Sequence, residues 1–135
     1  FDGLEPALAR AMMAIPAARG VEFGHGFGVQ NMQGSEHNSP WGGTSEDPVL
    51  VGERPDGALA GLSTGAPVHV RTAFKPPSSI PQSQTTLNIK NNQQEPLVVK
   101  GRHDPVLGPR AVAVVEAMAL LVVSDLMLRG GFHDE

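Results

Sequence analysis

Five consecutive residues near the carboxyl end of the chain place three chemically useful side chains next to one another. Residues 101–105 read Gly-Arg-His-Asp-Pro. Arg102 is a permanent cation that could clamp an anion, while His103 and Asp104 could act as an acid and a base. Successive side chains on a strand point to opposite faces, so all three converge only if the backbone turns, which Pro105 favours. A solvated turn with a local pair between Asp104 and Arg102 explains the same residues equally well.

A second segment combines one cation with two hydroxyls. The sequence Lys-Pro-Pro-Ser-Ser begins at Lys75. A lysine is a point charge that suits phosphate, and the hydroxyls of Ser78 and Ser79, with nearby backbone N–H groups, could complete an anion site. The spacing matches no standard phosphate-binding loop. An ordinary connection stiffened by Pro76 and Pro77 is therefore the simpler interpretation of the residues alone.

The other ionisable residues indicate structure rather than a metal site. Glu116 lies in a long apolar run, where an ionised carboxylate needs a partner, and we expect it to pair with an arginine such as Arg110 or Arg71. The five histidines show no spacing typical of a metal triad. The sequence therefore predicts no metal site.

A helix is predicted at the start of the chain. Apolar residues recur there at spacings of three and four and form one stripe: Leu4, Ala7, Leu8, Ala11, Met12 and Ile15. Asp2 is the predicted N-cap, because Glu5 follows three residues later in capping-box position. Pro16 ends the helix.

Short strands and one long loop are predicted in the middle of the chain. Alternation or β-branched content marks five stretches as strands, at residues 20–24, 58–63, 68–74, 85–89 and 97–99. The second and third of these are predicted to pair as a hairpin, and a polar turn at 91–95 joins the last two. Residues 31–56 are polar and lack periodicity, so they predict a long loop of the kind that is usually functional or disordered.

The strongest pattern is a long apolar run at residues 110–129. Pro109 suits the first position of a helix, and Gly130 suits the position after its end. The run is apolar nearly all round, so it predicts a buried helix. Glu116 and Asp125 interrupt it, and we therefore expect no membrane span. The fold class predicted for the single domain 1–135 is α+β, an antiparallel sheet packed on helices.

Composition limits the kinds of partner. The chain has 135 residues, a net charge of −4 and no cysteine. The acidic balance argues against nucleic acid as the main partner, because phosphates require cations. The absence of cysteine excludes disulfides and thiolate ligands, and it fits a cytoplasmic protein. The first residues carry no signal-peptide pattern and lack an initiating Met, so we expect a segment upstream.

The motifs occur in the order in which one enzyme family carries them. They are Met-Met-Ala-Ile-Pro-Ala ending at Ala17, Gly-Val-Glu-Phe-Gly from Gly20, Leu-Ala-Gly-Leu-Ser-Thr-Gly from Leu59, Lys-Pro-Pro-Ser-Ser-Ile from Lys75 and Lys-Gly-Arg-His-Asp-Pro from Lys100. Together they resemble the C-terminal half of chorismate synthase. The resemblance covers essentially the whole chain.

The resemblance implies a reaction, a cofactor and a fold. The family's enzyme converts 5-enolpyruvylshikimate-3-phosphate to chorismate and phosphate, a 1,4-anti-elimination on the shikimate pathway to aromatic compounds that needs reduced FMN. Its fold sandwiches helices between antiparallel sheets, of which this chain would form half, and the enzyme is typically a homotetramer. The family's N-terminal half carries the catalytic histidines and several substrate-binding arginines. Because that half is absent here, we expect the isolated chain to be inactive.

The resemblance also assigns roles to single residues. The family's flavin-binding positions match Ala17, Ala60, Lys75, Pro76, Pro77, Ser78 and Ser79. Arg102 matches an arginine on the flavin and substrate side. Asp104 matches a carboxylate with a proton-transfer role beside the flavin, and His103 is its neighbour. Ala60 stands where the family usually has glycine.

A second class of function remains open. The chain could be an isolated, non-catalytic module that binds phosphate or flavin, or that oligomerises. It lacks most of the cations that a multiply charged substrate requires, since it has 10 Lys and Arg against 14 Asp and Glu. Chorismate formation by the 135-residue chain would separate the two classes.

Overall fold

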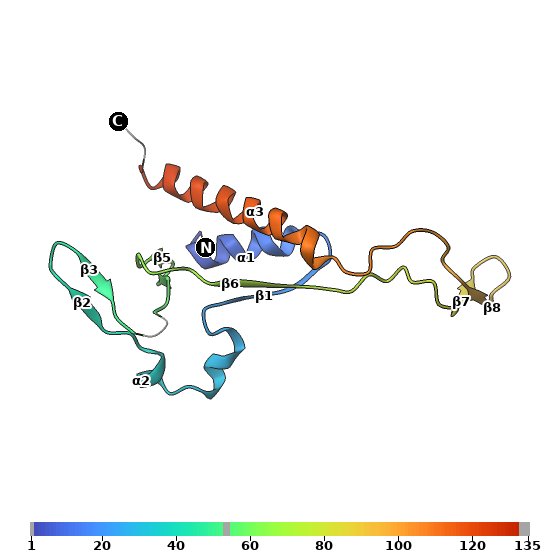
Figure 1. Ribbon diagram of the computed structural model, residues 1–135, viewed down its shortest axis with the longest axis horizontal. Helices are drawn as coiled ribbons and strands as arrows, with labels where there is room; N and C mark the ends of the chain where they lie inside the picture. The colour runs from blue at the N-terminus through green and yellow to red at the C-terminus, as the bar shows by residue number, and fades with distance from the viewer. Residues whose placement is uncertain (1, 53–54, 133–135) are drawn as a thin grey trace.

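Four antiparallel strand pairs and three α-helices make up the computed structural model, which describes residues 2–52 and 55–132. The pairs are β1–β6, β2–β3, β4–β5 and β7–β8 (Figure 1). In chain order the elements are α1 (Leu4–Ala14), β1 (Ala18–Phe23), the 3₁₀ helix η1 (Gly26–Asn31), α2 (Gly34–His37), β2 (Trp41–Gly43), β3 (Pro48–Leu50), β4 (Ala58–Leu59), β5 (Leu62–Ser63), β6 (Val70–Phe74), β7 (Gln84–Asn88), β8 (Gln93–Leu97) and α3 (Gly108–Arg129). The predicted α+β class is confirmed.

Helix α1 carries the core. Its apolar stripe buries Leu8 and Met12, and the buried residues Ile15 and Ala18 continue the cluster beyond the end of the helix. Partly buried apolar side chains of β1, β6 and α3 pack against this cluster. Figure 1 shows α1 lying between the β1–β6 ribbon and α3, and α1 packs against both β1 and α3. The helix ends as predicted, with Ile15 in an extended conformation before Pro16.

The predicted N-cap of α1 is wrong. Gly3 occupies the N-cap position, and no side chain caps the helix there. The N–H of Leu4 instead donates to the carbonyl of Gly61 at 2.9 Å. The carboxylate of Asp2 is drawn away by two guanidinium groups: it accepts from Arg10 at 3.1 Å and from Arg129 at 3.0 Å.

The predicted hairpin between residues 58–63 and 68–74 is also wrong. Strand β6 pairs with β1, in a register that matches Val70 with Phe23 and Phe74 with Ala18. This pairing presents the apolar face of β6 to the stripe of α1. Residues 58–63 fold back on themselves as β4–β5, because Ala60 and Gly61 both adopt left-handed backbone angles (φ 50° and 87°) that suit a two-residue turn.

Residues 31–56, predicted as a loop, contain regular structure. The short helix α2 begins with a capping box in which the N–H of Gln33 donates to Glu36 at 2.7 Å. The hairpin β2–β3 follows, closed by a bond from the N–H of Thr44 to the carbonyl of Asp47 at 3.1 Å. Such short elements have no apolar periodicity, which is why the pattern did not predict them. Residues 53–54 of the predicted loop lie outside the described residues.

Hairpin β7–β8 is shifted from its prediction. The first strand agrees within a residue, but the second begins at Gln93, inside the predicted turn at 91–95. Side-chain amides explain the shift. Glu95 accepts hydrogen bonds from Asn88 at 3.1 Å and from Asn91 at 2.8 Å, which holds the two strands together beside the turn. These hydrogen bonds also lower the pKa of Glu95.

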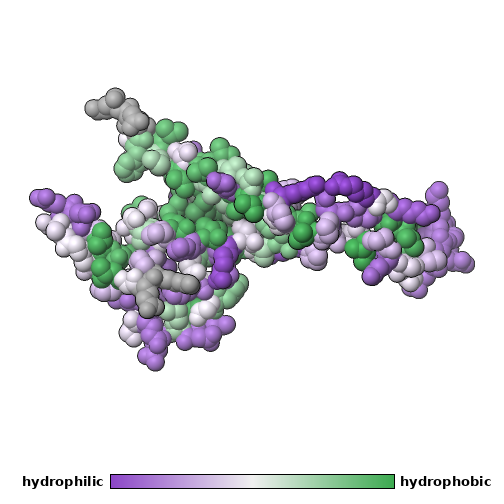
Figure 2. Space-filling view, viewed as in Figure 1, coloured by the Kyte–Doolittle hydropathy of each residue, from purple (hydrophilic) through white to green (hydrophobic). Residues whose placement is uncertain are grey.

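Helix α3 forms as predicted, but it is not buried. Ala111 is its one buried residue in the part of the chain that the structure describes. Its exposed large apolar residues are Val112, Val114, Leu120, Leu121, Val123, Met127 and Leu128, and Figure 2 shows apolar surface over this helix. Of the other described helices and strands, only α1 packs extensively against it. By length and composition α3 could cross a membrane, a test that core helices of water-soluble proteins also pass.

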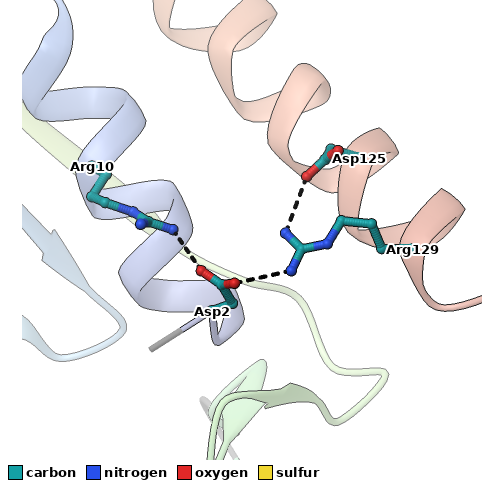
Figure 3. A network of polar contacts seen from close by, with 4 residues as sticks. All are labelled: Asp2, Arg10, Asp125 and Arg129. Carbon is teal, nitrogen blue, oxygen red and sulfur yellow. Dashed lines mark hydrogen bonds and ion pairs between the residues drawn. The ribbon is translucent and has the colours of Figure 1, made fainter.

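Charged side chains tie the start of the chain to the end of α3. Asp2 bridges Arg10 and Arg129, and Arg129 also pairs with Asp125 at 3.4 Å (Figure 3). The two arginines lower the pKa of Asp2, mainly through their hydrogen bonds to its carboxylate. The carboxylates of Asp2 and Asp125 raise the pKa of Arg129. The network therefore links the N-terminal end of α1 to the C-terminal end of α3.

Met12 tests the core. We expect Met12→Ala to lower the free energy of unfolding by about 2–5 kcal/mol, because the side chain is fully buried and a cavity replaces it. Met13→Ala is the matched control, since this neighbour on the same helix is 46% exposed and should change stability by less than about 1 kcal/mol. Urea unfolding of both variants measures the difference. Equal losses would contradict the assignment of the core.

Asp2 tests the link between α1 and α3. Because the pKa of Asp2 is lowered in the folded state, its stabilising contribution is present above the ordinary value of 3.8 and is lost as pH falls through the lowered pKa. We expect Asp2→Asn to be less stable than the parent chain at about pH 7, and this difference in stability to disappear as pH falls through the lowered pKa of Asp2. Urea unfolding across this range measures the gap. Asp47→Asn is the control, since Asp47 makes no ion pair within residues 2–52 and 55–132; a matching pH-dependent gap there would count against the link.

Candidate functional site

The end of the β1–β6 pair brings two predicted cofactor positions together. The backbone N–H of Lys75 donates to the carbonyl of Ala17 at 2.9 Å. Ala17 adopts a left-handed conformation (φ 69°), because the chain reverses here between α1 and β1 and the N–H of Ala18 bonds back to Ile15 at 3.1 Å. Ala17 and Lys75 are thus held by the same turn that ends α1.

The segment after Lys75 leaves the sheet. Pro76 and Pro77 cannot donate backbone hydrogen bonds, so the ladder of β6 stops at Phe74. The side chains of Lys75, Ser78 and Ser79 are exposed. Lys75 forms no ion pair with the described residues. One cation and two hydroxyls therefore remain free to meet an anion at this end of the molecule.

Residues 102–104 form a charged turn that α3 anchors. Asp104 accepts a hydrogen bond from Arg110, in the first turn of α3, at 2.9 Å. Its other oxygen lies 3.8 Å from Arg102, whose side chain is 83% exposed. The Nε2 atom of His103 is 3.4 Å from the carbonyl of Val99. The local pair between Asp104 and Arg102 is present but long, and the guanidinium of Arg102 stays largely available.

The predicted partner of Glu116 is wrong. Arg110 pairs with Asp104, and Arg71 pairs with Glu22 at 3.0 Å. Glu116 is exposed on α3 instead of buried, so water can solvate its charge and no arginine is needed.

The two predicted motifs lie on two connections between the same two parts of the molecule. Residues 75–83 run from β6 out to the β7–β8 hairpin, and residues 98–107 run back to α3 (Figure 1). At their inner ends, Phe74 and Gly108 line one hollow of about 440 Å³. The structure thus places the Lys75 loop and the Arg102 turn at the same end of the core.

Ala60 lies away from the end of the core that carries the Lys75 loop and the Arg102 turn. Its turn packs at the beginning of α1, where Gly61 accepts a hydrogen bond from Leu4, whereas Ala17 follows the end of that helix. An α-helix rises 1.5 Å per residue, so the 11 residues of α1 set these positions roughly 16 Å apart. The residues assigned to cofactor binding therefore occupy two places on this chain.

Some polar features were not predicted from the sequence. His37 of α2 pairs with Asp56 at 3.2 Å, and the ring of His25 packs edge-on against that of His37 at 5.7 Å. The hydroxyl oxygen of Thr72 is buried with no hydrogen-bond partner in the described ranges. Their sequence spacing carries no signal, because each contact depends on tertiary packing. No group of three metal-ligating side chains occurs among the described residues.

The fold and site define an α+β domain that exposes two cations, Lys75 and Arg102, at one end of its core. A sequence model described as chorismate synthase matches residues 1–128. The chain is 47% identical to a chorismate synthase of Dehalococcoides mccartyi over 131 residues, and 49% identical to one of Aeropyrum pernix. These alignments cover 97% and 95% of this chain but 36% and 34% of the relatives. The chain belongs to the chorismate synthase family.

A solved structure agrees with the sequence relatives. A crystal structure of chorismate synthase superposes on the chain with a TM-score of 0.66 and 27% identity. The match covers 94% of this chain and 30% of the other. The chain therefore spans about a third of the length of the proteins that it matches.

Proposed function

We propose that the chain acts as the C-terminal part of a chorismate synthase, a cytoplasmic lyase that eliminates phosphate from 5-enolpyruvylshikimate-3-phosphate with the help of reduced FMN. The observation that carries the proposal is the family match over residues 1–128. The exposed cations at the Lys75 loop and the Arg102 turn support it, because both FMN and the substrate are anions.

The side chains at this end fit the phosphate of FMN. Lys75 offers an ammonium group, Arg102 a largely exposed guanidinium, and Ser78 and Ser79 offer hydroxyl donors. These are the groups that we propose to hold the cofactor. Reduced FMN, when bound, would supply electron density as the phosphate leaves the substrate.

Asp104 is the proposed proton acceptor. Arg110 engages its Oδ2 atom at 2.9 Å and fixes the orientation of the carboxylate. Its Oδ1 atom, 3.8 Å from Arg102, makes no shorter ion pair within the described residues, which supports this oxygen as the proposed proton acceptor. His103, the next residue along the chain, is the second candidate for moving that proton.

We propose that the remaining catalytic residues come from a polypeptide segment that this sequence does not contain. The relatives are about three times as long as the matched region, and the exposed face of α3 offers apolar surface on which further chain can pack. That chain would also supply cations, because this one carries a net charge of −4. The complete enzyme is proposed to be a homotetramer.

FMN titration tests the site residues. We expect Lys75→Ala and Arg102→Ala each to weaken FMN binding by roughly tenfold, since each removes one charge-assisted contact to phosphate. Quenching of flavin fluorescence measures the affinity. Lys90→Ala, which removes an exposed lysine from the turn between β7 and β8, is the control and should leave affinity unchanged. The site assignment fails if all three variants bind like the parent chain.

An activity assay tests the need for the missing portion. We expect the 135-residue chain to form no chorismate from 5-enolpyruvylshikimate-3-phosphate with photoreduced FMN, because the two exposed cations of the candidate site, Lys75 and Arg102, cannot bind both anions. A full-length chorismate synthase assayed in parallel shows that the reagents work. Clear turnover by the isolated chain would refute the requirement for further chain. FMN binding without turnover is the result expected of a part of the enzyme that holds the cofactor but lacks the remaining catalytic residues.

A further inference from the structure

Hairpin β7–β8 stands apart from the core. Figure 1 shows it at the end of two long connections, and no other helix or strand in the described ranges packs extensively against it. The side chains of Leu87 and Leu97 are about half exposed, and that of Ile89 is almost fully exposed. An isolated two-stranded hairpin is marginally stable in water. Hairpin β7–β8 therefore needs a partner that covers at least one of its edges.

Pro96 fixes which backbone groups of the hairpin are free. It pairs with Thr85 and has no N–H, so it fits only where its nitrogen faces away from β7. The hydrogen-bonded pairs are then Gln84 with Leu97, Thr86 with Glu95 and Asn88 with Gln93. The N–H and C=O groups of Thr85 and Leu87 consequently point to the outer edge of β7.

The two edges of the hairpin differ in how open they are to another strand. The outer edge of β8 is interrupted by Pro96, and β8 also carries the charge of Glu95. Both features are ordinary protections of an edge strand. Strand β7, from Gln84 to Asn88, carries no charge or proline, and its pairing with β8 is free of bulges. The unprotected edge is therefore that of β7.

We propose that β7 pairs with β7 of a second copy of this chain, antiparallel about a twofold axis at Thr86. This register joins Thr85 of each copy to Leu87 of the other through the free backbone groups. It also places Thr86 opposite Thr86 and Gln84 opposite Asn88 across the interface. The two hairpins then form one four-stranded sheet in the order β8–β7–β7–β8.

The sequence of β7 favours a second copy as the occupant. A twofold interface brings identical residues together, so any charge near the axis would repel its own copy. Strand β7 has none, and Thr–Thr pairs across antiparallel strands are favourable. The one carboxylate of the hairpin strands, Glu95, is on β8, away from the axis, and is already held by Asn88 and Asn91. The proposal names one contact between copies within the homotetramer proposed above and does not depend on the proposed catalytic function.

Disulfide trapping tests this register. The chain has no cysteine, so one introduced residue gives an unambiguous cross-link. Residues facing each other at a non-hydrogen-bonded pair are about 4.5 Å apart between Cα atoms, within disulfide range. We expect Thr86→Cys in the full 135-residue chain to form a covalent dimer on mild oxidation, scored by non-reducing electrophoresis.

Gln93→Cys is the matched control. Gln93 is exposed like Thr86 and shares its face of the hairpin, but it is on β8. In the proposed sheet the two Gln93 residues are separated by three strand spacings across the sheet, about 14 Å, and are also offset along the strands, so they lie too far apart for a disulfide. Cross-linking of Thr86→Cys at least about tenfold faster than of Gln93→Cys supports the proposal. Equal rates would overturn it and would indicate contact between copies through another surface, such as the exposed face of α3. No dimer from either variant would also overturn it and would favour further chain as the occupant of the β7 edge.

Discussion

The packing of the apolar stripe of α1 is the interaction on which the remainder of the structure depends. Met12 and Leu8 are buried between the β1–β6 ribbon on one side and α3 on the other. The turn that ends this helix carries Ala17, whose carbonyl accepts the N–H of Lys75. The start of α3 carries Arg110, which orients Asp104. One buried stripe therefore fixes both halves of the candidate site, although neither half is itself buried.

Local features were predictable from the sequence, whereas partners were not. Pro16 ends α1 and Gly130 follows α3, because proline and glycine act on their own backbone. The strand that pairs with β6 was not predictable in this way, because it is decided by which strand can pack beside β6 against the apolar stripe of α1. The Lys75 and Arg102 motifs were recognisable by residue type, but their placement at one end of the core follows from the β1–β6 pairing. The exposure of Glu116 was unpredictable, because an apolar run indicates burial only where enough chain exists to cover it.

Two surfaces of the structure are incomplete in different ways. The exposed face of α3 is apolar, and a soluble monomer rarely presents so much apolar area. The outer edge of β7 is polar, but its backbone groups lack partners in the hairpin. An apolar face can pack against segments of many different structures, whereas a strand edge pairs with another strand in a defined register. The chain spans about a third of its relatives, so the two surfaces need not be covered by the same partner.

Charge pairing separates the arginines that hold the fold from the cations of the candidate anion site. Arg71, Arg110 and Arg129 are each engaged by a carboxylate of their own chain at 3.0 Å or less. These three guanidinium charges therefore stabilise the fold and are not available to bind an external anion. Lys75 and Arg102 keep their charge exposed, and both lie at the end of the core where α3 begins. Two cations can balance the phosphate of one FMN, but they leave nothing for a substrate that carries its own phosphate and carboxylates. The electrostatics of this chain thus suit the proposed role of one part of a cofactor site.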